Sequence, residues 1–276
     1  MFAPKPRLNV RPPDVAGSFY PRGESELKAI VESLLAEPKS SGRGRLLGVI
    51  APHAGYMYSG PIAASAFAEV PAAGHSYARV LLIGPPHYVS VRGIAASSAK
   101  AFATPLGDVP IDTDAIGHLV GQGVVSTDDR AHAPEHSLEV ELPFLQTVLG
   151  DFTLIPLLVG DASPQDVAAV IGAIMDGRTL LVVSTDLSHY LDDVSAKARD
   201  RATAAAIERL DYATLGPYEA CGFSALNGAL CAAQERGWMI RRLDLRNSGD
   251  TSGDRSRVVG YGAWSISAKT SGLKLQ

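Results

Sequence analysis

The sequence predicts an α/β fold, a three-layer α/β/α sandwich around a mixed, mostly parallel central sheet. Four continuous apolar runs are typical of strands buried on both faces, at residues 46–50, 80–83, 152–159 and 180–183. Stretches with helical periodicity alternate with these runs, so helices are expected to cover both faces of the sheet. At 276 residues, with 46% apolar residues, the chain is long enough to bury such a core without disulfides.

The individual elements follow from local signals. We expect Ser25 to cap a first helix, because apolar residues recur at the helical period after it. Ser163 and Pro164 predict the start of another helix. Further helices are expected at about 61–70, 194–210 and 223–235, strands at 239–245 and 258–266 that form an antiparallel edge, and surface loops at 37–44 and 244–257. The stretch 94–151 is less regular, and Pro143 within it either kinks a helix or begins one.

Composition excludes several classes of protein. A net charge of −4 and a pI near 6.0 argue against a nucleic-acid-binding surface, which must be basic. No window reaches the roughly 18 consecutive apolar residues of a membrane span, and the proline-rich start does not resemble a signal peptide. Only Cys221 and Cys231 are present, too few for a disulfide framework. We therefore expect a single domain over residues 1–276, in the cytoplasm, with no nucleic-acid or membrane partner.

Three histidines follow the ends of three predicted strands. His53 comes after the run at 46–50, His87 after 80–83 and His189 after 180–183. Because the carboxyl ends of parallel strands lie along one edge of a sheet, these imidazoles are expected to share one pocket. Neutral imidazole is the commonest protein ligand for transition metals, so the pocket is a candidate metal site.

A metal site needs a further ligand, and the sequence offers two. Asp186 lies three residues before His189, and Cys221 precedes a predicted helix. The positive end of a helix dipole would lower the pKa of the Cys221 thiol and favour the thiolate. A small buried residue is an equally good interpretation of Cys221.

A second polar cluster surrounds Glu135 and His136. These two residues could support the metal ligands or act as an acid and base, and they could equally cap the helix that follows. Tyr56, Tyr88 and Tyr190 crowd the histidine loops and could line a substrate pocket. The alternative is that they pack at strand ends, where one side of a ring is buried and the other is wet.

Several motifs, in order along nearly the whole chain, resemble those of the Memo family. They are Ala16–Pro21, Ala51–Tyr56, Gly84–His87, Glu135–Glu139, Ser184–His189, and Ser248–Asp254 followed by Val258–Tyr261. The resemblance implies the fold of the class III extradiol ring-cleaving dioxygenases, which use non-haem Fe(II). By this resemblance, His53 and His87 match the metal-binding histidines, and His189 with Asp186 matches the acid/base region. Cys221 falls where Memo proteins place a cysteine in the metal site instead of the dioxygenase carboxylate, which puts catechol cleavage in doubt.

The resemblance also implies a setting. Memo-like proteins of bacteria and archaea are associated with a radical-SAM protein, whereas eukaryotic relatives are described as signalling adaptors. Three hypotheses follow. The first is an iron-dependent oxidoreductase, copper being an alternative metal, with His189 moving a proton and Asp186 orienting it. The second is a non-catalytic metal- or peptide-binding protein that keeps the pocket. The third is a zinc-dependent hydrolase.

Overall fold

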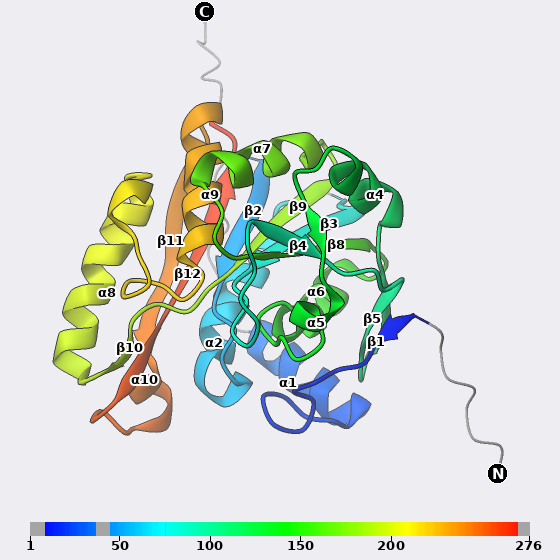
Figure 1. Cartoon of the computed structure of the whole chain (residues 1–276). Helices are drawn as coiled ribbons and strands as arrows, with labels where there is room; N and C mark the ends of the chain where they lie inside the picture. The colour runs from blue at the N-terminus through cyan, green and yellow to red at the C-terminus, as the bar shows by residue number, and fades with distance from the viewer. Residues whose placement is uncertain (1–8, 37–44, 75, 270–276) are drawn as a thin grey trace, which may run out of the picture.

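The computed structural model describes residues 9–36, 45–74 and 76–269, and it is an α/β protein with a mixed sheet (Figure 1). Within these residues the main sheet has nine strands. In spatial order they are β10 (His189–Leu191), β12 (Val258–Ser267), β2 (Leu46–Ala51), β9 (Thr179–Ser184), β3 (Arg79–Gly84), β8 (Thr153–Val159), β4 (Ile94–Ala96) and β7 (Ser126–Thr127), with β11 (Met239–Asn247) paired to β12. A small second sheet contains β1 (Val10–Arg11), β5 (Ala101–Thr104) and β6 (Gly107–Pro110).

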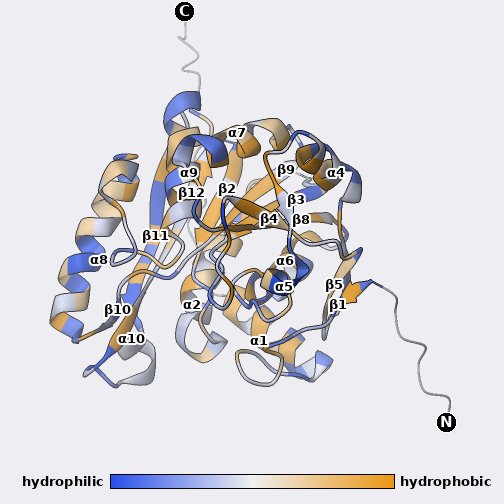
Figure 2. Cartoon of the chain, viewed as in Figure 1, coloured by the Kyte–Doolittle hydropathy of each residue, from blue (hydrophilic) through white to orange (hydrophobic). Residues whose placement is uncertain are grey.

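The centre of the main sheet confirms the sequence prediction. Strands β2, β9, β3 and β8 are mutually parallel, with Val49 opposite Val182 and Leu81 opposite both Ile155 and Leu181. Nearly all residues of these four strands are buried, as expected for a sheet covered on both faces. Figure 2 shows the centre of the sheet largely in the orange of hydrophobic residues. The C-terminal strands β11 and β12 add an antiparallel edge to β2, also as predicted.

The helices form separate packed groups, an arrangement consistent with a three-layer sandwich (Figure 1). Helices α1 (Glu24–Leu35), α2 (Tyr56–Phe67), α3 (Glu69–Ala72) and α6 (Leu142–Leu149) contact one another. Helix α7 (Pro164–Ile174) packs against α9 (Phe223–Arg236), and α8 (Asp193–Glu208) packs on β11 and β12. The shorter helices are α4 (Thr113–Gly121), α5 (Asp129–His132), α10 (Ser248–Ser252), η1 (Glu139–Glu141) and η2 (Tyr212–Thr214).

Helix starts were predicted with mixed success. Ser163 caps α7 as predicted, by accepting a hydrogen bond from the backbone N–H of Asp166. The prediction for α1 was wrong, because the helix already begins at Glu24 after Gly23, and Ser25 lies inside it. Helix α2 begins at Tyr56, so Pro61 lies inside this helix and not at its start. Pro143 occupies the first turn of α6, where a proline costs no hydrogen bond, so it begins this helix and does not kink it.

The expected loop at 244–257 is only partly a loop. Strand β11 continues to Asn247, and the short helix α10 follows it. Asn247 and Asp250 form a reciprocal capping box that accounts for this extra turn of helix. The loop predicted at 37–44 lies outside the described residues. Among the residues that are described, no helix has the length and apolar character needed to cross a membrane.

Candidate metal centre

The loops after β2, β3 and β9 meet at one edge of the sheet, where they surround a cavity of about 480 Å³. His53, His87 and His189 all line this cavity, as their positions after strand ends predicted. The other residues of its wall are Ser18, Phe19, Ala54, Gly55, Met57, Tyr58, Tyr88, His136, Asp186, Tyr190 and Val259.

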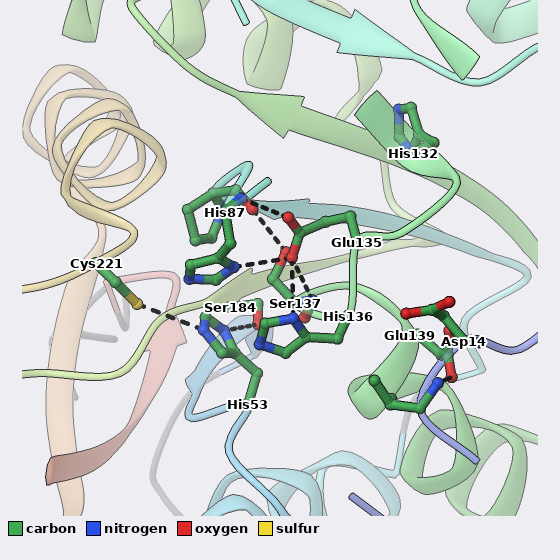
Figure 3. A network of polar contacts seen from close by, with 12 residues as sticks. Asp14, His53, His87, His132, Glu135, His136, Ser137, Glu139, Ser184 and Cys221 are labelled. Atoms are coloured by element: carbon green, nitrogen blue, oxygen red, sulfur yellow. Dashed lines mark hydrogen bonds and ion pairs between the residues drawn. The ribbon is translucent and has the colours of Figure 1, made fainter. Parts of the chain in front are cut away.

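Among the described histidines, His53, His87 and His136 come close together. One ring nitrogen from each lies within 4.8 Å of the other two, so this cluster could hold a metal ion (Figure 3). The ring centroids are 5.1 Å apart for His53 and His87, 4.7 Å for His87 and His136, and 5.6 Å for His53 and His136. The sequence offered His136 as a supporting residue, whereas the structure places it among the three.

His189 lies in the same cavity but is oriented differently from the prediction. Its Nδ1 donates to the carbonyl oxygen of Leu187 at 2.8 Å, so Asp186 is not the group that orients this ring. Asp186 instead accepts the backbone N–H of His53 through Oδ1 at 2.9 Å. Burial raises the pKa of Asp186 to about 7, although that hydrogen bond works in the opposite direction.

Glu135 fixes the loop that carries His87. Its carboxylate accepts from the ring Nδ1 of His87 at 2.8 Å and from the backbone N–H groups of His87 and Ser137. Burial acts to raise the pKa of Glu135, but these hydrogen bonds outweigh it and the pKa is lowered. A carboxylate that holds the Nδ1–H of a histidine leaves Nε2 free to bind a metal. Support of a histidine is one of the three roles that the sequence left open for Glu135.

One ring nitrogen of His136 is buried without a hydrogen-bond partner in the described part of the chain. Its Nδ1 is buried and has no hydrogen-bond partner among the described residues, although Glu135 Oε1 lies 3.5 Å away. Burial lowers the pKa of His136, so the ring favours the neutral form that coordinates metals. Phe19, from one of the Memo-like motifs, packs edge-on against this ring at a centroid distance of 4.8 Å.

His53 is the most buried member of the cluster. Its Nδ1 contacts Ser184 Oγ at 2.8 Å, and its Nε2 faces Cys221 Sγ at 3.4 Å. Burial lowers the pKa of His53 well below its ordinary value, and the neighbouring His87 and His136 add to this effect. The ring is therefore neutral at pH 7.

Cys221 does face one of the histidines, His53, but the pKa shift that the sequence predicted for its thiol has the wrong sign. Burial raises the pKa of the thiol, and the nearby Asp186 raises it further, so the protonated form is favoured over the thiolate. The helix-dipole argument fails because desolvation outweighs it at this half-buried position. The sulfur accepts the backbone N–H of Asp186 at 3.3 Å, which fixes it beside His53.

The tyrosines divide between the core and the rim of the cavity. Tyr56 was expected in the pocket, but its ring packs between Tyr20 and Phe144 and its hydroxyl donates to the Val140 carbonyl. Tyr88 and Tyr190 do line the cavity, with 58% and 64% of their surfaces exposed. Tyr190 has a φ of +60°, a strained value for a non-glycine residue, at an irregularity in the pairing of β10 with β12.

Three residues of the site were not singled out from the sequence as site residues. Ser184 ends β9 and contacts His53, and Glu141 in turn contacts Ser184 at 2.8 Å. Ser137 presents its carbonyl to the same serine at 2.7 Å. A Cβ on Gly84 would lie 3.3 Å or less from Ser137 Oγ and Ser184 Cβ, so a glycine here permits the close approach of these loops. No spacing in the sequence signals such contacts.

Comparison with known proteins agrees with the motifs. The family model for Memo-like proteins matches residues 11–265. This chain belongs to the Memo family. Among its relatives are MEMO1 family proteins of Thermotoga neapolitana, 35% identical over 91% of this chain and 98% of the relative, and of Aeropyrum pernix, 36% identical over 93% and 99%. A MEMO1 family protein of Nitrosopumilus maritimus is 32% identical over 92% of this chain and 98% of its own.

The names of these relatives give a family and no reaction. The Memo motifs of this chain nevertheless converge in space, because four of them supply Phe19, His53, His87 and His136 to one cavity. Chemistry must therefore be argued from the site itself.

Proposed function

We propose that this Memo protein is a metalloprotein whose cation is held by His53, His87 and His136, with Cys221 beside them as a further ligand. We further propose a redox role, with Fe(II) as the metal and a fold related to that of the class III extradiol dioxygenases. The observation that carries the metal site is the convergence of three imidazole nitrogens within 4.8 Å of one another.

The donor set fits a transition metal. Imidazole nitrogens and a thiol suit iron, copper and zinc, whereas magnesium and calcium prefer oxygen ligands. Two ligands on one tetrahedral ion, a sulfur at about 2.3 Å and a nitrogen at about 2.05 Å, lie roughly 3.5 Å apart. The separation of Cys221 Sγ from His53 Nε2 is 3.4 Å, which agrees with that value. Because the pKa of the thiol is raised, metal binding is expected to release its proton.

Within this proposal, Fe(II) would supply the one-electron chemistry that dioxygen requires. We assign the proton transfer to His189. A carbonyl oxygen can only accept, so the 2.8 Å contact with Leu187 places a proton on Nδ1 and leaves Nε2 as the basic atom. Burial lowers the pKa of His189, which keeps the ring neutral and able to accept a proton at pH 7. Tyr88 and Tyr190 at the rim would hold an apolar or planar part of the substrate.

Metal analysis of protein purified without oxygen and without a His-tag tests the site. We expect about one transition-metal ion per chain and loss of nearly all of it in His53→Ala/His87→Ala. His118→Ala changes an exposed histidine and serves as the matched control. The redox role predicts that the anaerobically loaded Fe(II) protein consumes oxygen when a panel of catechols or other reducing substrates is added. Retention of the metal by the double variant would rule out the site.

The closeness of Cys221 favours a second candidate, a metal-handling protein without turnover. Three histidines and a thiolate would fill a tetrahedral ion and leave no open position for a substrate. Co(II) loading distinguishes the two, because thiolate coordination gives an intense charge-transfer band. A band that disappears in Cys221→Ser, together with no oxygen uptake on any substrate, would favour the closed site.

A further inference from the structure

Ser184 is the meeting point of three buried groups. Its hydroxyl oxygen lies 2.8 Å from His53 Nδ1, 2.8 Å from Glu141 Oε1 and 2.7 Å from the backbone carbonyl of Ser137. Ser184 and Glu141 have no exposed surface at all, so water does not complete this network. The donor and the acceptor of each hydrogen bond to Ser184 can therefore be assigned.

A serine hydroxyl donates one hydrogen bond and accepts two. The Ser137 carbonyl can only accept, so the single proton of Ser184 must point at it. The other two neighbours of Ser184 must then donate to it. For His53 this places a proton on Nδ1 and leaves Nε2, the atom that faces Cys221, without one. For Glu141 it requires a protonated carboxyl group.

We propose that Glu141 is a neutral carboxylic acid that donates its proton to Ser184, and that it thereby acts as a positioning residue holding His53 in the tautomer with Nε2 free to bind a metal. The metal-binding part of this inference rests on the proposed function. If Ser184 turned its proton toward His53, the buried Ser137 carbonyl, which can only accept, would lose its donor.

The surroundings of Glu141 agree with a neutral group. Its second oxygen, Oε2, is buried and has no hydrogen-bond partner among the residues described. An unsatisfied oxygen costs far less on a neutral carboxyl group than on a carboxylate. Burial also raises the pKa of Glu141 well above its ordinary value, and Asp186 raises it further.

Infrared spectroscopy of the metal-free protein tests the protonation directly. At pH 7 we expect the carbonyl stretch of a protonated carboxyl group in the wild-type protein, shifted by deuteration and lost in Glu141→Gln. Asp186→Asn is the matched control, because the pKa of Asp186 is raised to about 7 and this residue contributes a band of its own. If no band disappears in Glu141→Gln, Glu141 is a carboxylate and the proposal is overturned.

Metal affinity tests the positioning role, with Co(II) as the probe. Loss of a group that orients a metal-binding histidine typically weakens binding about 10- to 100-fold. We expect a loss of that size for Ser184→Ala and about tenfold for Glu141→Leu. Glu141→Gln should stay within about threefold of wild type, because its amide N–H replaces the acid as the donor. Equal affinity of the Leu and wild-type proteins would overturn the positioning role.

The two measurements separate this inference from the proposed function. If the wild-type protein shows the carboxyl band but binds no metal, the proposed function fails and the protonation of Glu141 stands. If the metal binds tightly but the band is absent, the metal site stands and Glu141 has been assigned the wrong state.

Discussion

Glu139 and Glu141 are two residues apart and both are fully buried, yet their surroundings are opposite. Glu139 accepts from the Arg11 guanidinium at 2.7 Å, from the backbone N–H of Asp14 at 2.8 Å and of Val15 at 3.0 Å, and from the Tyr20 hydroxyl at 2.5 Å. The Glu141 side chain has one hydrogen bond among the residues that the structure describes, with Ser184 (Figure 3 shows Glu139 and Ser184). A buried carboxyl group is stable either as a fully paired anion or as a neutral acid. This short segment contains one of each.

The difference between the two glutamates corresponds to a difference in role, because Glu139 belongs to a structural ion pair and Glu141 is connected to the candidate metal site. Arg11 ties strand β1 to Glu139 and also donates to the backbone carbonyls of His132 and Glu135 at 2.7 and 2.5 Å. It therefore fixes the loop that delivers His136 to the metal cluster. Glu141 is the last residue of η1 and is connected to His53 through Ser184. The carboxyl group of Glu139 stabilises the structure around the site, and that of Glu141 orients the proposed metal ligand His53.

The substitution expected to destabilise the surroundings of Glu139 most is Arg11→Met. This variant leaves a buried carboxylate without its cation, and we expect the free energy of unfolding to fall by about 3–5 kcal/mol. Urea denaturation measures the change. Arg130→Ala is the control, because its side chain is 88% exposed and its surface ion pair with Asp128 should contribute less than about 1 kcal/mol. A loss as small as that control's would mean that Arg11 does not stabilise Glu139.

Acidification should destabilise the folded protein, because His132 in the same region resists protonation when it is buried. Burial lowers the pKa of this ring to about 4 from its ordinary 6.5, so the folded protein favours the neutral form. The stabilisation is complete above pH 6.5 and is lost as the pH falls toward 4, by an amount on the order of 3 kcal/mol. Urea denaturation between pH 4 and 7 should show a flatter pH dependence for His132→Gln than for wild type. Identical slopes would contradict this account of His132.

Glutamine substitutions sharpen the comparison between the two glutamates. Glu139→Gln replaces an anion that accepts four hydrogen bonds, and we expect it to cost about 2 kcal/mol at pH 6. Glu141→Gln replaces one neutral group by another of the same shape and should cost less than about 1 kcal/mol. Thermal and urea unfolding of both variants measure the difference. Equal losses would mean that the two carboxyl groups are in the same state.

The last prediction concerns the pH dependence of stability. Because burial raises the pKa of Glu141 in the folded state, the folded protein binds a proton that the unfolded chain has released. Wild-type stability is therefore penalised increasingly as the pH rises above the unfolded pKa near 4.5. Metal-free Glu141→Gln should gain stability relative to the wild type as the pH rises above 4.5, because a glutamine has no proton to lose. A constant difference between pH 5 and 7 would exclude a raised pKa.

The parallel centre of the sheet could be predicted because its strands are long, apolar and bounded by clear loop signals. The region at 94–151 could not, since β4, β5, β6 and β7 have only two to four residues each. Such short strands have too few residues to show a period. They are stabilised by pairing with distant strands, which the local sequence does not record.

The site was predictable to the same extent. His53 and His87 follow the ends of long strands, and that position alone placed them together. His136 follows no such strand, and its place depends on Arg11, more than 120 residues away, which holds the carbonyl of Glu135. Tyr56 was misplaced because the residues after β2 resemble a loop, whereas the helix begins at Tyr56 and turns its ring into the core.

The Arg11–Glu139 pair also has a consequence for protein synthesis. The two residues are 128 positions apart, so a ribosome adding about 5–20 residues per second makes Glu139 roughly 6–26 s after Arg11. During that interval Arg11 lacks its carboxylate partner, and a guanidinium destined for the interior stays hydrated. The loop bearing His136 therefore cannot be fixed by Arg11 in its final arrangement until Glu139 has been made.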